Sequence, residues 1–392
     1  MKIDPYNHKI KYQQWKEKVD EIGYIEGISK ENSEIILKYV FDMELGINVS
    51  SKSSKGSRSY IRLNNLKQRM ALLAKRMNDT GLTDNILNLN EELLIQFFSK
   101  MRNGEIKRLD GGVYTSVVDF VKVFKSFWHW HIKSSKKKGL EIPDITSDLD
   151  CSSDKPKWVY LTEEEVRNLW NRANYDYKIL IMFLFDTGIR APTELMNIKV
   201  SDFLNNFKEL NIRNEISKTF GRRIKLMLCS KEIEEYIKIK GFGGEDYLFT
   251  KKPHNVNTYL RNLGKKVFGD GLSLAGQKYS QLTMYDFRHI SCCYWLPRYK
   301  SESALKFRFG WKKSDKIHYY SEMLGMRDTI SQEDLLVDTT KTEIEKRLTK
   351  AEKENELLKD ELNELREQNK KILRIVQESY DKGIMILNLE NR

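Results

Sequence analysis

Residues 186–195 read Asp186-Thr187-Gly188-Ile189-Arg190-Ala191-Pro192-Thr193-Glu194-Leu195. They follow the apolar segment 177–185, which predicts a buried helix that ends at Gly188. A buried helix and a tight turn would hold Arg190 rigidly. The alternative is a surface ion pair for Arg190, and the rigid setting favours a functional arginine instead.

The composition narrows the class of protein. The chain has 392 residues, with 68 Lys and Arg against 56 Asp and Glu, for a net charge of +12. This length predicts two or three domains, and 40% hydrophobic residues exclude a disordered chain. The longest strictly apolar run, 179–185, is too short for a membrane span. The four cysteines show no C-x-x-C spacing, so neither a disulfide framework nor a zinc knuckle is expected.

The charge is unevenly distributed along the chain. Residues 338–378 carry ten basic and eleven acidic side chains, so the excess positive charge belongs to the residues before them. A basic body favours double-stranded DNA as the partner. The N-terminus shows no apolar signal core, so we expect no membrane association and a cytoplasmic location.

The periodicity predicts a mainly α protein with a small β-sheet. Apolar residues recur at helical spacing in 32–39, 66–77, 91–101 and 113–131, which predicts a helical domain over 1–140. The strongly apolar 113–131 is expected to be helix core rather than a base-stacking surface. A polar, basic segment predicts a linker at 141–157.

A second domain is expected over 158–325. Thr162 and Glu165 have the spacing of a capping box at a helix start. Alternation in 208–228 predicts short strands around a turn, and the remainder is expected to be mostly helical.

Two basic segments are candidates for contact with a DNA backbone. The Ser-rich segment 49–62 combines hydroxyls and cations with a helix start, a combination suited to phosphate; a solvated loop is the equal alternative. The segment 133–139 is a basic linker that can also lie along DNA. The candidate residues in these segments are Lys52, Lys55, Arg58, Arg62, Lys136 and Lys137.

The segment 338–378 shows an unbroken heptad pattern. Apolar residues and two asparagines alternate at steps of four and three, which predicts a coiled coil. Asn355 and Asn369 at a positions favour two strands, and charges at the flanking positions suit a parallel dimer. A single helix folded back on its own body is the alternative.

Three further segments accompany 186–195. Residues 217–224 read SKTFGRRI, residues 282–289 read LTMYDFRH, and Phe309-Gly310-Trp311 precedes Tyr320, which lies nine positions after Trp311. In this order and spacing the four segments resemble the tyrosine recombinase (phage integrase) family, with its T-G-x-R, lysine-hairpin, H-x-L-R-H and L-G-H/W boxes. The resemblance covers about 156–325 well and 10–140 more faintly, so it implies a helical core-binding domain followed by a mixed α+β catalytic domain.

The resemblance implies specific roles. Arg190 and Arg288 would meet the charge of a phosphodiester under attack, since two guanidiniums offer fixed bidentate geometry. Lys218 would be the general acid for the leaving 5′ oxygen, and Tyr320 the nucleophile, with Tyr319 as its neighbouring competitor. Trp311 can donate its indole N–H to a phosphate oxygen.

Two positions depart from the family pattern. Tyr285 stands where the family has His or Lys, so the base that accepts the nucleophile's proton is open, with His289 and His318 as candidates. The spacing from Arg190 to Glu194 is one residue longer than the common form, which affects the supporting role of Glu194. Backbone contacts are assigned to two further hairpin residues, Arg222 and Arg223.

The family implies a site-specific DNA recombinase, an integrase of a mobile element, that acts as four protomers on DNA. The chemistry needs no metal and no nucleotide cofactor. One alternative is a catalytically lapsed relative that acts as a DNA-binding architectural or regulatory protein. Another is a relaxing enzyme of topoisomerase type, which the coiled coil disfavours.

Overall fold

The computed structural model describes residues 3–50, 56–152, 157–299, 301–324, 358–359, 361–370 and 373. These residues form a mainly helical protein with one small three-stranded sheet, which confirms the predicted fold class. None of the described helices combines the length and the apolar character that crossing a membrane requires.

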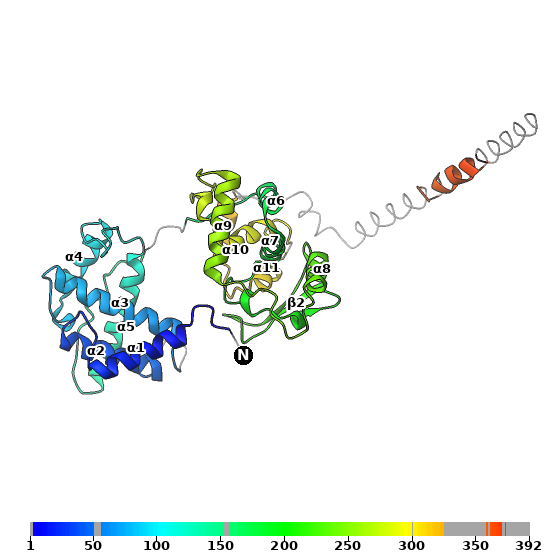
Figure 1. The fold of residues 1–392 in the computed structure, drawn as a ribbon. Helices are drawn as coiled ribbons and strands as arrows, with labels where there is room; N and C mark the ends of the chain where they lie inside the picture. Colours follow the sequence, from blue (N-terminus) through cyan, green and yellow to red (C-terminus); the bar gives the residue numbers. More distant parts are fainter. Residues whose placement is uncertain are drawn as a thin grey trace, which may run out of the picture. The chain divides into compact units, whose positions relative to one another are not determined.

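The first part of the chain is a group of packed helices (Figure 1, blue to cyan). Its elements are α1 (His8–Ile22), α2 (Lys30–Leu45), α3 (Tyr60–Asp79), η1 (Ile86–Asn88), α4 (Glu91–Arg102) and α5 (Val117–Lys136). Ser29, Ser59 and Asn90 cap three of these helices, because each side chain accepts a hydrogen bond from the backbone N–H three residues further along the chain.

Helix α5 supplies the largest share of aromatic side chains to the first core. Phe127 and Trp130 are buried against Tyr39 of α2, with ring centroids 5.4 and 5.1 Å from the Tyr39 ring. This burial confirms that the apolar pattern of 113–131 marks helix core. Ile145 and Leu149 join the same core, so the first half of the predicted linker packs on it.

The second part contains the remaining helices and the sheet. Its elements are α6 (Glu163–Arg172), α7 (Tyr175–Thr187), η2 (Leu195–Asn197), η3 (Val200–Asp202), β1 (Phe203–Leu204), β2 (Glu209–Ile212), β3 (Arg222–Lys225), α8 (Ser230–Lys240), α9 (Pro253–Phe268), η4 (Tyr279–Gln281), α10 (Asp286–Trp295), α11 (Glu302–Phe309) and α12 (Asp315–Met323). The capping box of α6 is present: Thr162 and Glu165 each bond the other's backbone N–H.

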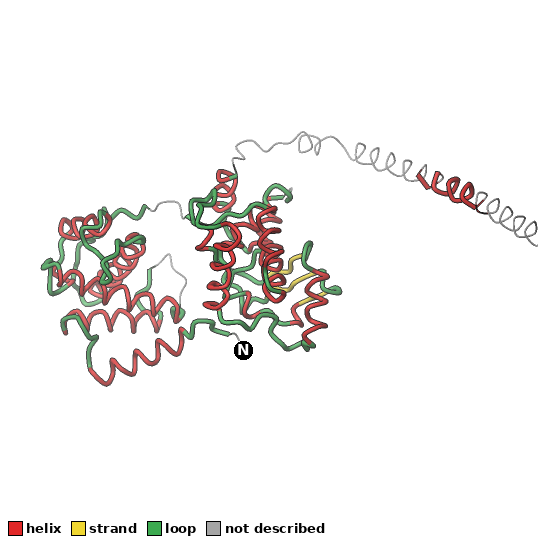
Figure 2. Tube along the Cα trace, turned by 45° about the horizontal axis from the view of Figure 1, so that its top comes forward, coloured by secondary structure: helices red, strands yellow, loops and turns green. Residues whose placement is uncertain are grey.

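The sheet is antiparallel with the order β1-β2-β3, and Figure 2 shows its strands as a small patch among helices. Ile212 of β2 lies opposite Arg222 of β3, and Asn211 opposite Arg223. Successive side chains of a strand point to opposite faces. Arg222 is therefore buried, whereas Arg223 is exposed.

Two helices end in left-handed glycines that the packing requires. Gly188 caps α7 with φ 56°, and Gly310 caps α11 with φ 61°. A Cβ on Gly188 would lie 2.3 Å from a ring carbon of Phe309, and one on Gly310 would lie 2.9 Å from Nη1 of Arg222. Glycine at both positions lets the two helix ends approach their neighbours closely.

A buried ion pair connects the end of α7 to α11. Nη2 of Arg308 lies 2.7 Å from Oδ1 of Asp186, and both side chains are almost fully buried. The other carboxylate oxygen of Asp186 accepts three backbone N–H bonds from residues 227–229, which directly precede α8. One carboxylate thus fixes three elements around the end of α7.

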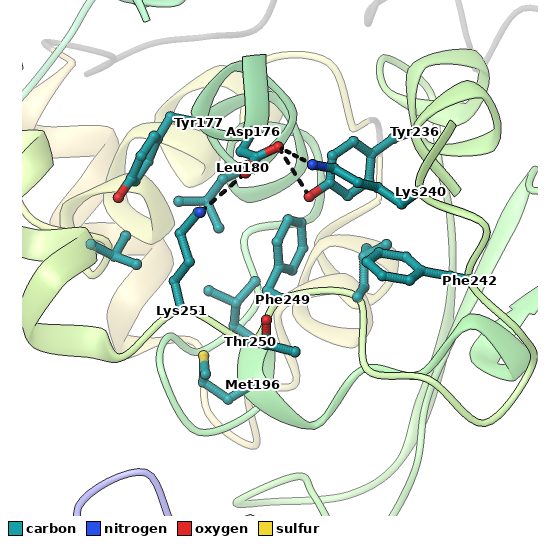
Figure 3. Close-up of a pocket in the computed structure, with 13 residues that line it drawn as sticks. Asp176, Tyr177, Leu180, Met196, Tyr236, Lys240, Phe242, Phe249, Thr250 and Lys251 are labelled. Atoms are coloured by element: carbon teal, nitrogen blue, oxygen red, sulfur yellow. Dashed lines mark hydrogen bonds and ion pairs between the residues drawn. The ribbon is translucent and has the colours of Figure 1, made fainter. Parts of the chain in front are cut away.

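The start of α7 is held by a second charge cluster, at the rim of a mostly apolar cavity of about 140 Å³. Figure 3 shows Lys240 and Lys251 reaching Asp176 from two sides, at 3.0 and 3.1 Å. Tyr236 also directs its hydroxyl to Asp176 (3.5 Å). These contacts tie α7 to α8 and to the segment before α9.

Part of the predicted coiled coil lies in the described residues. Residues 358–359, 361–370 and 373 are helical. Leu358, Leu362 and Leu365 of the heptad pattern are 58%, 52% and 58% exposed. Asn369, a further predicted seam residue, is also among the described residues. The other predicted seam residues lie outside them: Ile344, Leu348, Ala351, Asn355, Ile372 and Val376.

Candidate active site

The four sequence boxes meet around the buried carboxylate of Glu194. One of its oxygens lies 2.9 Å from Nη1 of Arg190, and the other accepts the Arg190 backbone N–H at 2.9 Å. Nη2 of Arg222 lies 2.8 Å from the same carboxylate. The longer spacing from Arg190 to Glu194 therefore does not separate the two residues, which contact each other across four positions of the chain.

Burial and charge act in opposite directions on Glu194. Burial alone would raise the pKa of its carboxyl, but the hydrogen bonds and charges of Arg222 and Arg190 outweigh it and lower the pKa to about 2. The carboxylate is thus ionised at neutral pH.

The sequence assigned Arg222 to the DNA backbone, and the structure corrects this. The Arg222 side chain is 0% exposed, and its Nε donates to the carbonyl oxygen of Arg308 at 2.8 Å. An arginine enclosed in this way is a structural partner of Glu194. Arg223, on the opposite face of the strand, is exposed, and its Nη1 lies 3.8 Å from Oε2 of Glu209.

Arg288 lies in the first turn of α10 with its guanidinium buried. Nη1 donates to the carbonyl oxygen of Gly188 at 2.6 Å, and Nη2 donates to that of Phe309. Burial and the nearby positive charge of Arg190 lower the pKa of Arg288 to about 10, so it stays protonated at neutral pH. Nη2 of Arg190 reaches the next carbonyl, that of Gly310, at 2.9 Å.

The loop between β2 and β3 lies beside Arg190. Ser217 donates to Glu194 at 3.2 Å, and Thr219 donates to the carbonyl oxygen of Gly310 at 2.8 Å, which also receives Arg190. Lys218, between them, is exposed. The two flanking hydroxyls thus fix the backbone that carries Lys218 at the edge of the arginine cluster.

Tyr320 of α12 is enclosed by aromatic rings and is 2% exposed. Trp311 stacks on it with ring centroids 5.9 Å apart, and Arg288 lies 5.8 Å from the Trp311 ring. The Tyr320 hydroxyl shares a hydrogen bond with Nδ1 of His289. Burial raises the pKa of the Tyr320 phenol far above its usual value, so the hydroxyl is neutral in this arrangement.

The other aromatic candidates occupy different places. Tyr285 stands at the start of α10, 53% exposed, with its ring 5.1 Å from that of His289. The Tyr319 hydroxyl accepts a hydrogen bond from the indole of Trp158 at 2.7 Å. His318 is exposed. Of the two candidate bases, His289 is therefore the one bonded to Tyr320.

Two of the predicted DNA-contact residues, Arg58 and Arg62, lie in a basic cavity of the first helical group. The cavity is about 320 Å³, and Lys122, Lys125 and His129 of α5 also line it. The sequence reasoning missed these three because it used only the apolar positions of 113–131. Their spacing of three and four residues was the available signal, since it places them on one helix face.

The remaining predicted contact residues divide into two sets. Lys136 and Lys137 are exposed at the end of α5. Lys52 and Lys55 lie outside the described residues.

The cluster of Arg190, Arg288, the loop with Lys218 and the enclosed Tyr320 lies in a fold that is also found in solved DNA complexes. The chain is similar to lambda integrase(75–356), solved as a dimer bound to a COC′ core site: 15% identity, TM-score 0.55, over 75% of this chain and 96% of that one. It is similar to the Tn1549 transposon integrase in complex with transposon right end DNA: 14% identity, TM-score 0.55, over 74% and 93%. It is also similar to the XerH site-specific recombinase bound to a palindromic difH substrate: 12% identity, TM-score 0.52, over 69% of this chain and 78% of that one.

The fold is that of the tyrosine recombinases. Residues 159–325 match the phage integrase family, which confirms the resemblance seen in the four boxes. No curated protein matches the sequence.

We expect Glu194→Gln to lower the free energy of unfolding by about 3–5 kcal/mol, because it leaves the buried guanidinium of Arg222 without a counter-charge. The folded-state pKa of Glu194 is depressed, so its stabilising effect is present above the unfolded value near 4.5 and is lost as pH falls towards 2. Urea unfolding from pH 6 to pH 2.5 should show a smaller loss of stability in the variant than in the wild type.

Glu245→Gln is the matched control. Glu245 pairs with Lys199 on the surface, where an ion pair contributes little. Equal effects of the two substitutions would contradict a special place for Glu194.

Proposed function

We propose that the chain is a site-specific DNA recombinase, an integrase of a mobile element, that cleaves and rejoins DNA through a 3′-phosphotyrosine. The observation that carries the proposal is the convergence of Arg190, Arg288 and the Lys218 loop near Tyr320, from segments up to 130 residues apart in the chain.

The two arginines suit a phosphodiester under attack. A guanidinium has five N–H donors, and Arg190 and Arg288 each direct one of their Nη2 donors to a backbone carbonyl at the end of α11. Their remaining donors can meet the non-bridging oxygens, where negative charge grows in the transition state. One preorganised donor of this kind contributes about 3–4 kcal/mol in measured enzymes.

The proposed cleavage of the DNA strand needs no reactant other than the DNA and side chains of the protein. The Tyr320 oxygen forms a bond to phosphorus, and the bond from phosphorus to the 5′ oxygen breaks. The Tyr320 proton passes to Nδ1 of His289, and Lys218 gives a proton to the leaving oxygen. Reversal by a new 5′ hydroxyl reseals the DNA and restores both groups.

DNA is the proposed partner over both parts of the chain. The similar solved chains, lambda integrase, Tn1549 integrase and XerH, are bound to DNA. In the first helical group, the cavity lined by Arg58, Arg62, Lys122 and Lys125 concentrates positive charge where phosphates can bind.

The first test uses a nicked suicide duplex that carries the element's attachment site. We expect the wild type to form an adduct that resists SDS, and Tyr320→Phe to form none, because the phenol oxygen makes the covalent bond. Gel separation of protein–DNA adducts measures both.

Tyr319→Phe is the matched control: it removes the neighbouring hydroxyl and leaves Tyr320, so it should still form the adduct, even if more slowly than the wild type. A wild type that binds the site but forms no adduct would instead support a catalytically lapsed DNA-binding protein. An adduct on duplexes without the attachment site would support the relaxing enzyme.

The second test concerns the base. His289→Asn keeps an acceptor near the Nδ1 position but cannot take the proton. This variant should form the adduct at least about tenfold more slowly than the wild type, as general-base losses are typically larger still.

Tyr285→Phe serves as the control for this experiment, because it keeps the ring beside His289 and removes only a hydroxyl. A tenfold loss of rate in Tyr285→Phe, with His289→Asn at the wild-type rate, would assign the base to Tyr285.

We propose that the segment 338–378 pairs with a second copy as a parallel coiled coil, within a tetramer on DNA. A lone helix in water gains nothing from three half-exposed leucines, Leu358, Leu362 and Leu365, whereas a second copy would bury them. The net charge of the segment is only −1, so repulsion between copies is small.

The third test measures the mass of the free protein by light scattering. We expect Leu362→Gln, at an a position, to shift the protein towards the monomer, because a polar side chain enters the seam. Deletion of 340–392 should give the monomer. Glu364→Gln, at a c position outside the seam, should leave the mass unchanged; a deletion that leaves the dimer intact would refute the pairing.

A further inference from the structure

Trp158 is a buried residue whose backbone is hydrogen-bonded to the segment before α10. Its backbone N–H reaches the carbonyl oxygen of Ala275 at 3.4 Å, and its carbonyl oxygen accepts from Ser273 at 3.2 Å. The next N–H, that of Val159, donates to Asp286 at the start of α10. Both sides of the Trp158 backbone are therefore fixed to the segment that precedes α10 and to α10 itself.

The side chain of Trp158 contacts three groups of the candidate site. Its ring stacks on His289, with centroids 4.8 Å apart and planes 28° apart. Its Nε1–H donates to the Tyr319 hydroxyl at 2.7 Å. Its ring meets Tyr320 edge-on at 6.3 Å. One indole thus touches the base, the nucleophile and the tyrosine next to the nucleophile.

We propose that Trp158 is a positioning residue that selects Tyr320 over Tyr319 as the nucleophile; the inference rests on the proposed function. Adjacent side chains of a helix point about 100° apart, so fixing one hydroxyl of α12 fixes the direction of the other. An indole N–H is a donor only. It holds the Tyr319 oxygen at the edge of the indole, and this leaves Tyr320 facing His289.

The same ring orients the base. Trp158 covers one face of the His289 imidazole, and Nδ1 contacts the Tyr320 hydroxyl. The lone pair of a neutral imidazole nitrogen lies in the plane of the ring, at its edge. Stacking fixes the plane of the imidazole, and the plane fixes the direction of Nδ1. Base and nucleophile are therefore aligned by two contacts from one side chain, a stack and a hydrogen bond.

The test is a double-mutant cycle on the suicide duplex. Trp158→Phe keeps an aromatic ring on His289 and removes the N–H, and Tyr319→Phe removes its acceptor. Each should slow adduct formation by about 5- to 10-fold, the value of one buried hydrogen bond. The double variant should be no slower than either single variant, because both remove the same bond.

A second measurement reads out selection itself. Mass spectrometry of the proteolysed adduct should show DNA on Tyr320 alone in the wild type, and on both Tyr319 and Tyr320 in Trp158→Phe. A merely structural tryptophan would lower the amount of adduct without moving its position.

Trp170→Phe is the matched control. Trp170 also has a buried indole N–H, but that N–H has no hydrogen-bond partner among the described residues, so its removal should leave the rate and the position of the adduct unchanged. Losses that multiply in the double variant, or a Trp158→Phe variant indistinguishable from Trp170→Phe, would overturn the proposal.

Hydrogen exchange separates this inference from the proposed function. In the full-length protein without DNA, peptides covering α12 should exchange faster, and equally, in Trp158→Phe and Tyr319→Phe. A wild type without any adduct would refute the recombinase. Unchanged exchange in both variants would refute the positioning contact, whatever the outcome on DNA.

Discussion

The site depends on the ion pairs that the buried carboxylate of Glu194 makes with Arg190 and Arg222. Glu194 binds the side chains of Arg190 and Arg222 and the backbone at Arg190, with its own side chain 1% exposed. Removing charges from water is costly, and a buried pair is often no more stable than a well-packed apolar one. What the cluster supplies is a fixed geometry, because each guanidinium has few other positions in which its charge is compensated.

The ends of two helices complete that geometry. The carbonyls of Gly188, Phe309 and Gly310 lie where α7 and α11 end, and there the last carbonyls of a helix lack partners within it. Arg190 and Arg288 supply donors to these carbonyls, at the negative ends of the helix dipoles. Three guanidiniums around one carboxylate leave an excess of positive charge, and burial beside Arg190 already lowers the pKa of Arg288. A phosphate is the kind of group that relieves this excess.

The sequence predicted the fold and located the four boxes, but it did not predict every contact between their residues. Apolar periodicity located α5 and α7, because burial imposes that pattern directly. The neighbouring arginines of β3 could not be assigned, since alternation requires that Arg222 and Arg223 face opposite sides but does not say which faces Glu194. Trp158 was missed because its contacts with α10 and α12 join residues more than 130 positions apart, and no local pattern encodes them.

Aromatic rings enclose Tyr320, the proposed nucleophile. Trp158, Trp311 and His289 surround the phenol, and the desolvation that they cause raises its pKa. A neutral, buried phenol does not react with solvent components, but its deprotonation needs an acceptor already in place. His289 is bonded to it and stacked on Trp158, so in the proposed reaction the imidazole need not reorganise to accept the proton. The half-exposed phenol of Tyr285 has no such bond to Tyr320 among the described contacts. The departure of this chain at position 285 is thus consistent with a base supplied one helical turn later, on the same helix.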